Sequence, residues 1–169
     1  MKKTLIIALC CFAVAFASCK KKPVDPTPVD PIDYTENYVG NYVGSYTFNI
    51  SSINGQPQSF SFEMDDIRMD IAKGTGDNVI TATVTIDDVT RQTTGTAKED
   101  KADFDFVHLG VVKPEFAIEL DFKMEATKVA SDTMNITGTF KDGTGWILFG
   151  QTLDINDAEG TLSGKLVKQ

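Results

Sequence analysis

Histidine, cysteine and tryptophan are scarce in this chain of 169 residues, which contains one histidine, three cysteines and one tryptophan. With His108 as the single histidine, a metal site built from several imidazoles is impossible. The cysteines are Cys10, Cys11 and Cys19, so everything after residue 19 lacks disulfides, thiolate metal ligands and a cysteine nucleophile. We therefore expect a folded domain without a metal ion, a cofactor or a cross-link.

Basic residues are also in short supply, because 16 Lys and Arg face 24 Asp and Glu and give a net charge of −8. Removal of residues 1–18 would take away Lys2 and Lys3 but no carboxylate, so the charge would become −10. Nucleic-acid binding needs clustered cations that displace counterions from phosphates. We expect no nucleic-acid partner, and we expect any membrane attachment to be covalent.

Only one hydrophobic run stands out, Leu5–Phe16, and it is too short to cross a bilayer comfortably as a helix. It follows two lysines and ends in Ala17-Ser18, the order of a secretory signal. Cys19 comes next, and in this respect the segment resembles a bacterial lipoprotein signal, although Phe16 stands where the common lipobox has an aliphatic residue. The resemblance implies that residues 1–18 are removed and that Cys19 is lipidated. The alternative is a secreted protein with a free thiol at Cys19.

The lipoprotein resemblance places the protein in the cell envelope, at the outer membrane, with its domain facing the periplasm or the exterior. The segment after Cys19 has prolines at positions 23, 26, 28 and 31. Such a density favours an extended polyproline II chain, so residues 19–37 are interpreted as the lipidated cysteine and a tether. Its fourteen residues 20–33 would span roughly 40 Å at about 3.1 Å per residue.

From residue 38 to residue 169 apolar and polar residues alternate with period two, which predicts β-strands. The clearest example is 115–125, where every second residue is apolar. Asn54-Gly55 is a strong turn dipeptide. The apolar positions change parity across Asp65-Asp66 and Asp87-Asp88, where we favour hairpins over β-bulges. Asp142-Gly143 is predicted to be a further turn.

This pattern predicts an all-β domain of about eight to ten strands, arranged as an antiparallel up-and-down β-barrel, with a β-sandwich as the alternative. The first strand opens with Gly40-Asn41-Tyr42. It resembles the opening strand of calycin-like (lipocalin-like) barrels, where a Gly-x-Trp motif packs its aromatic residue at the closed end. Here tyrosine replaces the tryptophan. The resemblance implies a barrel over residues 38–169.

No catalytic constellation is visible. His108 shares parity with Phe104 and Phe106, whereas Asp103 and Asp105 point the other way, so a local Asp–His dyad is disfavoured and a partly buried histidine at a strand end is expected. Adjacent carboxylates such as Asp65 and Asp66 point to opposite faces of a strand, and aspartate is common in turns. We do not expect an enzyme.

The aromatic residues suggest a ligand instead, because a barrel of about eight strands can hold one small molecule. Six residues with apolar-face parity are the candidates for an apolar ligand site: Tyr46, Phe48, Phe62, Phe116, Phe122 and Trp146. The same residues would serve a filled core, and the sequence leaves both readings open. We predict a membrane-anchored, non-catalytic barrel that binds a small apolar ligand. The alternative is a protein-interaction or inhibitor module of the envelope without a cavity.

Overall fold

The computed structural model describes residues 31–169 except residue 149, and it leaves the side chain of Phe106 undescribed. The predicted signal peptide 1–18, the lipidation site Cys19 and most of the tether lie outside the described residues. Within the described part, no helix has the length and apolar character needed to cross a membrane.

Nine β-strands and one 3-10 helix make up the described chain. The helix η1 spans Thr35–Asn37. The strands are β1 (Gly40–Ile53), β2 (Gln56–Lys73), β3 (Val79–Ile86), β4 (Val89–Ala97), β5 (Lys101–Lys113), β6 (Phe116–Ala130), β7 (Thr133–Leu148), β8 (Thr152–Ile155) and β9 (Ala158–Lys168).

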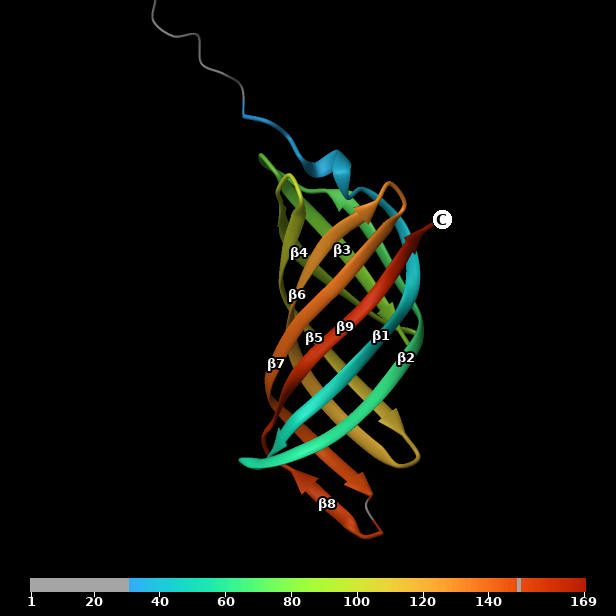
Figure 1. Ribbon diagram of the computed structural model, residues 1–169, viewed down its shortest axis with the longest axis vertical. Helices are drawn as coiled ribbons and strands as arrows, with labels where there is room; N and C mark the ends of the chain where they lie inside the picture. Colours follow the sequence, from blue (N-terminus) through green and yellow to red (C-terminus); the bar gives the residue numbers. More distant parts are fainter. Residues whose placement is uncertain (1–30, 149) are drawn as a thin grey trace, which may run out of the picture. The chain divides into compact units, whose positions relative to one another are not determined.

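Eight of these strands close into a ring (Figure 1). Strands β1 to β7 follow one another around the ring, and β9 pairs with both β7 and β1 and so closes it. The short strand β8 pairs with the last residues of β7, from Gly145 to Leu148. All pairings are antiparallel, so the predicted up-and-down β-barrel is confirmed and the sandwich alternative is wrong.

Two of the predicted turns are tight hairpins. Asn54 and Gly55 have φ values of 52° and 72°, and they connect the ladder partners Ile53 and Gln56. Asp87 and Asp88 have φ values of 46° and 64° and connect Ile86 to Val89. Positive φ at both central positions matches the twist of the flanking strands, and aspartate tolerates it better than most residues.

Two other predicted turns are β-bulges instead. Asp65 and Asp66 lie inside β2, where both face the single residue Ser45 of β1, so no hairpin joins Met64 to Ile67. Asp142 and Gly143 lie inside β7 and face Leu120 of β6 in the same way. A bulge inserts one extra residue and shifts the parity of the buried face, as a two-residue turn would.

A third bulge lies in β5 and changes the orientation of His108. Asp105 and Phe106 face the single residue Lys123 of β6, so Val107 and Leu109 point into the core after Phe104. His108 is therefore exposed in the middle of a strand, which corrects the prediction that it shares a face with Phe104 and is partly buried at a strand end.

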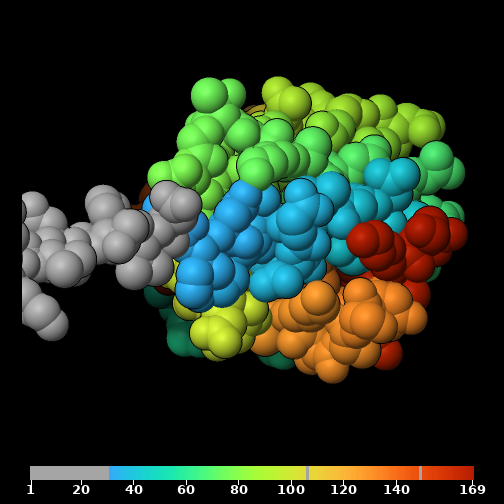
Figure 2. Space-filling model, turned by 90° about the horizontal axis from the view of Figure 1, so that it is seen from above, coloured from blue at the N-terminus to red at the C-terminus, as the bar shows by residue number. Residues whose placement is uncertain are grey.

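Residues 31–39, which precede β1, cover one end of the barrel (Figure 2). Tyr38 is fully buried there, and its hydroxyl donates to the carbonyl of Lys98 at 3.1 Å. The hydroxyl of Tyr42 donates to the carbonyl of Tyr38 at 2.9 Å, so the tyrosine of Gly40-Asn41-Tyr42 does pack at a closed end. The side chain of Asn78 accepts from the backbone of Tyr34 and donates to the carbonyl of Ile32. The last residues of the predicted tether are thus held on the barrel.

Candidate functional site

Five of the six predicted ligand residues lie inside the barrel. Tyr46, Phe48 and Phe122 are completely buried, and Phe62 and Phe116 are less than a tenth exposed. The placement of Trp146 on the inner face was wrong. The bulge at Asp142 shifts the parity of β7, so Ile147 is buried while Trp146 is only half-buried, on the outer face.

The buried aromatic rings form a continuous column along the inside of the barrel. Phe48 stacks on Phe62 with ring centroids 5.0 Å apart, and Phe62 contacts Phe116 at 4.8 Å. Phe60, half-buried, extends the column with a 5.7 Å contact to Phe116. The column therefore runs from the middle of the barrel to the end opposite η1, where the β1–β2 and β5–β6 hairpins lie (Figure 1).

The hydroxyl of Tyr46 is buried at the inner end of this column. Its contacts are the sulfur atoms of Met69 at 3.9 Å and Met124 at 3.8 Å. Thioether sulfur is a weak acceptor, and a buried tyrosine usually finds an oxygen or nitrogen partner. The interior thus contains a hydrogen-bond donor beside two flexible side chains that can change rotamer. The sequence pattern places Tyr46 inside but gives no sign of its partners.

Removing this hydroxyl should cost almost nothing. We expect Tyr46→Phe to change the free energy of unfolding by less than about 1 kcal/mol, because a weak sulfur contact is all that is lost. Tyr42→Phe is the matched control and should destabilise by about 1 kcal/mol or more, since its hydroxyl donates to a backbone carbonyl. Urea unfolding measures both. Equal losses in the two variants would contradict the description of the Tyr46 environment.

Burial also raises the pKa values of three tyrosines. The pKa of Tyr38 rises to about 12, first through burial and then through the nearby charges of Asp100 and Asp103. Burial likewise raises the pKa values of Tyr42 and Tyr46. A raised pKa means that the folded state favours the neutral hydroxyl. The associated stability is present below pH 10, the ordinary tyrosine value, and is lost as the pH rises through the folded-state value.

We therefore expect the barrel to lose stability from pH 10 toward pH 12, with tyrosinate absorbance from these residues appearing together with loss of the β-sheet circular dichroism signal. A parallel absorbance and circular dichroism titration checks this. Tyr38→Phe should move the onset to higher pH. Full ionisation of all tyrosines near pH 10 with an intact circular dichroism spectrum would refute the prediction.

The wall of the barrel is incomplete between β4 and β5. Backbone pairing between the two strands joins Gly95–Ala97 to Ala102–Phe104, and among the described residues it goes no further. Farther from η1, β4 and β5 still face each other, but no backbone ladder is described between Val89–Thr94 and Asp105–Lys113. We call these two segments the seam. The β3–β4 hairpin ends well above the lower end of the barrel (Figure 1).

Side chains rather than backbone groups bridge the seam. The hydroxyl of Thr94 donates to the carboxylate of Asp105 at 2.7 Å, and that of Thr93 donates to the Asp105 carbonyl at 3.2 Å. At the lower end Lys113 pairs with Asp87 at 2.7 Å. The two exposed contacts, Thr94 with Asp105 and Lys113 with Asp87, contribute little, typically below about 1 kcal/mol each. Among the described residues, separating the two strands along the seam would therefore break these side-chain contacts and no hydrogen bond from one backbone to the other.

Burial along β4 changes at the same point as the pairing. The inward positions Thr93, Gly95 and Ala97 are buried, whereas Arg91 is exposed and Val89 half-buried. Arg91 is the ladder partner of Val84, which is 2% exposed, so its side chain starts on the inner face. Its guanidinium donates to the carbonyl of the neighbouring Thr90 and, within residues 31–169 as described, pairs with no carboxylate. The seam thus gives solvent access to an inward-facing position.

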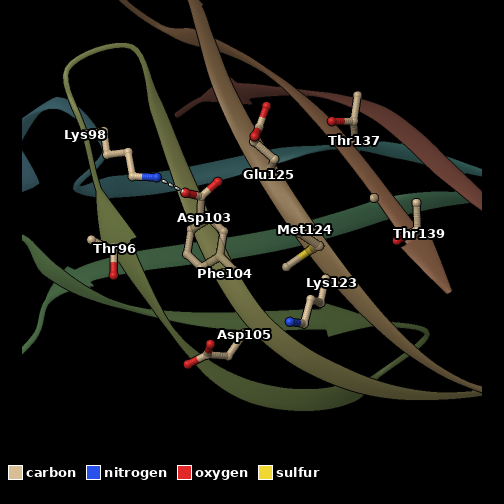
Figure 3. Close-up of a pocket in the computed structure, with 11 residues that line it drawn as sticks. Thr96, Lys98, Asp103, Phe104, Asp105, Lys123, Met124, Glu125, Thr137 and Thr139 are labelled. Carbon is tan, nitrogen blue, oxygen red and sulfur yellow. Dashed lines mark hydrogen bonds and ion pairs between the residues drawn. The ribbon is translucent and has the colours of Figure 1, made fainter.

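A shallow groove on the outer surface offers a second location (Figure 3). It is lined mainly by outward residues of β5, β6 and β7 and by the end of β4, and the buried side chains of Phe104 and Met124 form part of its floor. Its charged groups are already paired, since Lys98 pairs with Asp103 and Lys101 pairs with Glu125. The hydrogen bond from Lys98 is the main reason that the pKa of Asp103 is lowered. This groove has the character of a solvated outer face with satisfied ion pairs.

His108 and Asp121 form a cross-strand pair on the outside, with His108 Nδ1 2.9 Å from a carboxylate oxygen. Both side chains are more than half exposed to solvent. No group of three or more His, Cys, Asp or Glu side chains within the described ranges is arranged to hold a metal ion.

Comparison with known proteins adds little. No family model matches this chain, and no curated protein matches it. A solved structure described as EF1p2_mFAP2b bound to DFHBI is 16% identical, with a TM-score of 0.41, over 80% of this chain and 97% of that chain. We draw no inference about a ligand from this likeness, because barrels of one fold class serve many unrelated functions.

Proposed function

We propose that the protein is a lipid-anchored, calycin-like β-barrel of the bacterial cell envelope, attached to the outer membrane through Cys19, that binds a small apolar ligand and catalyses no reaction. The observation that carries the ligand proposal is the Tyr46 hydroxyl, which is fully buried and has only the sulfur atoms of Met69 and Met124 as partners. A filled core would normally give this donor a better acceptor. A ligand with an acceptor atom would supply one.

The aromatic column supports an apolar ligand. Phe48, Phe62 and Phe116 present ring faces and edges to one another, and aromatic side chains with adaptable methionines are the usual lining of apolar sites. Binding would require the methionine side chains to move, because the described interior is packed around Tyr46. The carboxylates that form ion pairs and His108 lie on the outer surface, which supports binding rather than catalysis.

Phenylnaphthylamine, a neutral apolar probe that fluoresces when it leaves water, tests the ligand proposal. The mature chain carrying Cys19→Ala should bind it saturably, with one molecule per barrel. Phe62→Ser, placed in the column, should weaken binding, whereas Thr139→Ser on the outer face should not. Absence of a saturable signal, or equal binding by both variants, would overturn the proposal.

The lipid anchor is tested separately. Cys19→Ala should release the protein from the membrane fraction or leave the signal peptide attached. Ser18→Ala, which keeps the cysteine and a small residue before it, should leave the protein membrane-bound and acylated. A Cys19→Ala protein that is processed and anchored like the wild type would refute the lipoprotein assignment.

A second candidate function rests on the outer surface. Val112, Ala117 and Trp146 are ladder partners on neighbouring strands, and Val112 is 77% exposed. Exposed apolar residues in one row favour contact with another protein. A photo-crosslinking residue at Val112 should then capture a defined envelope protein that the same residue at Thr137, on the outer face of β7, does not capture. Identical capture patterns at both positions would remove this candidate.

A further inference from the structure

The seam and Arg91 together indicate which ligand the barrel takes and how that ligand reaches the interior. We infer, resting on the proposed function, that the ligand is a small amphipathic anion, which passes between β4 and β5, places its apolar part beside Tyr46 and pairs its anionic group with Arg91.

The ladder places Arg91 in register with the Tyr46 environment. Arg91 pairs with Val84 of β3, Val84 pairs with Met69 of β2, and the sulfur of Met69 contacts the Tyr46 hydroxyl. Neighbouring strands are about 4.8 Å apart, so the backbones at Arg91 and Met69 are roughly 10 Å apart. A ligand with one or two fused rings, or a short chain, would reach from the guanidinium to the hydroxyl.

The charge of Arg91 determines the ligand class. A guanidinium binds carboxylate and sulfonate groups through two parallel hydrogen bonds, and it does so best where water is partly excluded. Arg91 starts on the inner face beside buried Val84, and its described partner is a neutral carbonyl. The protein as a whole is acidic, so long-range attraction would not bring an anion here. A preference for anions would have to come from this one side chain.

The seam is the part of the wall that can open with the smallest loss. Elsewhere in the ring the strands are joined by longer ladders, such as the eight pairs between β3 and β4. Opening such a ladder would lose several backbone hydrogen bonds at about 1 kcal/mol each. At the seam, the contacts to break are Thr93 and Thr94 with Asp105, and Lys113 with Asp87. The end of the barrel that precedes β1 is covered by η1 and Tyr38.

The ligand class is tested with two probes that share one ring system. Anilinonaphthalenesulfonate carries a sulfonate, and phenylnaphthylamine is its neutral counterpart. In the Cys19→Ala chain, Arg91→Gln should weaken sulfonate binding roughly ten- to hundredfold and leave the neutral probe unchanged. Lys165→Gln is the control, because Lys165 is exposed on β9, which neighbours neither β4 nor β5, and its loss changes the net charge equally. It should affect neither probe.

The route is tested by a cross-link across the seam. Asp87→Cys with Lys113→Cys, joined by a reductively cleavable bis-maleimide, should slow binding of both probes at least about tenfold, and reduction should restore the rate. Lys98→Cys with Asp103→Cys is the matched control, because this pair also removes one lysine and one aspartate but lies beside the hydrogen-bonded part of β4 and β5. Its cross-link should leave the rates unchanged.

The three results test the ligand class, the entry route and the proposed function separately. If Arg91→Gln weakens both probes equally or neither, the anionic ligand class is overturned. If the cross-link at positions 87 and 113 leaves the binding rates unchanged, passage through the seam is overturned. If the unmodified chain binds neither probe, the proposed function itself fails, and this result is distinct from the other two.

Discussion

Replacing Phe48 with alanine should lower the free energy of unfolding by about 3–5 kcal/mol. Phe48 is completely buried and contacts four other rings: Tyr46, Phe62, Phe122 and Phe140. The loss has a transfer component and a cavity component, and the cavity persists because the surrounding strands are tied into a closed ring. A domain of this size is typically stable by about 5–15 kcal/mol, so the variant should be near the limit of folding.

Urea unfolding followed by circular dichroism measures this change. Val112→Ala is the control, because Val112 is 77% exposed and should change stability by less than about 0.5 kcal/mol. A loss below about 1.5 kcal/mol for Phe48→Ala would mean that the barrel can collapse onto the vacated space. That result would contradict a column of rings held by a rigid wall.

Gly145→Ala should also have a large effect and lower the free energy of unfolding by about 3 kcal/mol or more. Gly145 has φ of 148°, a backbone conformation that favours glycine. A Cβ atom there would also collide with the carbonyl oxygen of Ala117 on β6. Backbone strain of about 1–3 kcal/mol and a similar overpacking cost then add. The position is critical because Gly145 pairs with both Ile118 and Ile155, where β8 joins the sheet.

Alanine substitutions at two other glycines show how much of the effect comes from backbone strain and how much from overpacking. Gly55→Ala has a left-handed φ of 72° but open space around the new atom, so it should cost only about 1–2 kcal/mol. Gly110 has neither a left-handed φ nor a close neighbour, since the nearest atom to a new Cβ is Glu119 Cγ at 3.9 Å. Gly110→Ala should therefore leave the free energy of unfolding almost unchanged. Denaturation of all three gives the comparison. A Gly145→Ala variant no less stable than Gly55→Ala would contradict the close packing of β7 on β6.

The strand pattern of this fold could be predicted because one face of each strand is buried, and burial imposes period two on the sequence. The alternation in 115–125 correctly places Phe116, Ile118 and Leu120 in the core. Asn54-Gly55 forms the predicted hairpin because both residues tolerate positive φ. The need of every apolar face to find a partner limits the fold to a barrel or a sandwich, and the pairing of β9 with both β1 and β7 makes it a barrel.

The bulges could not be distinguished from turns, because both shift the parity of the buried face. At Asp87-Asp88 the change of parity comes from a hairpin. At Asp65-Asp66 and Asp142-Gly143 it comes from a β-bulge inside a strand that continues. Which one forms depends on whether the neighbouring strand extends past the site, and the local sequence does not contain that information. The misplacement of Trp146 and His108 has the same physical origin.

The sequence pattern also could not predict the missing ladder between β4 and β5, for a related reason. Pairing between strands is a property of two segments, and a strand that loses its partner halfway still alternates. One signal was present, because the inward positions of β4 include Arg91 and Thr93 where other strands have large apolar residues. A charged residue such as Arg91 at an inward position indicates a site that is reached by solvent. The aromatic column, in contrast, was largely predictable, since Phe48, Phe62, Phe116 and Phe122 all lie on buried faces.

Binding of an apolar ligand inside the barrel beside Tyr46 can be observed through the methyl resonances of isotope-labelled methionines. Saturation of the Cys19→Ala chain with phenylnaphthylamine should shift the methyl signals of Met69 and Met124, which contact the Tyr46 hydroxyl. Met134 is also buried, but it lies at the start of β7, toward the end covered by η1, and should shift less. Saturable binding that leaves the signals of Met69 and Met124 unshifted would mean that the ligand does not bind beside Tyr46.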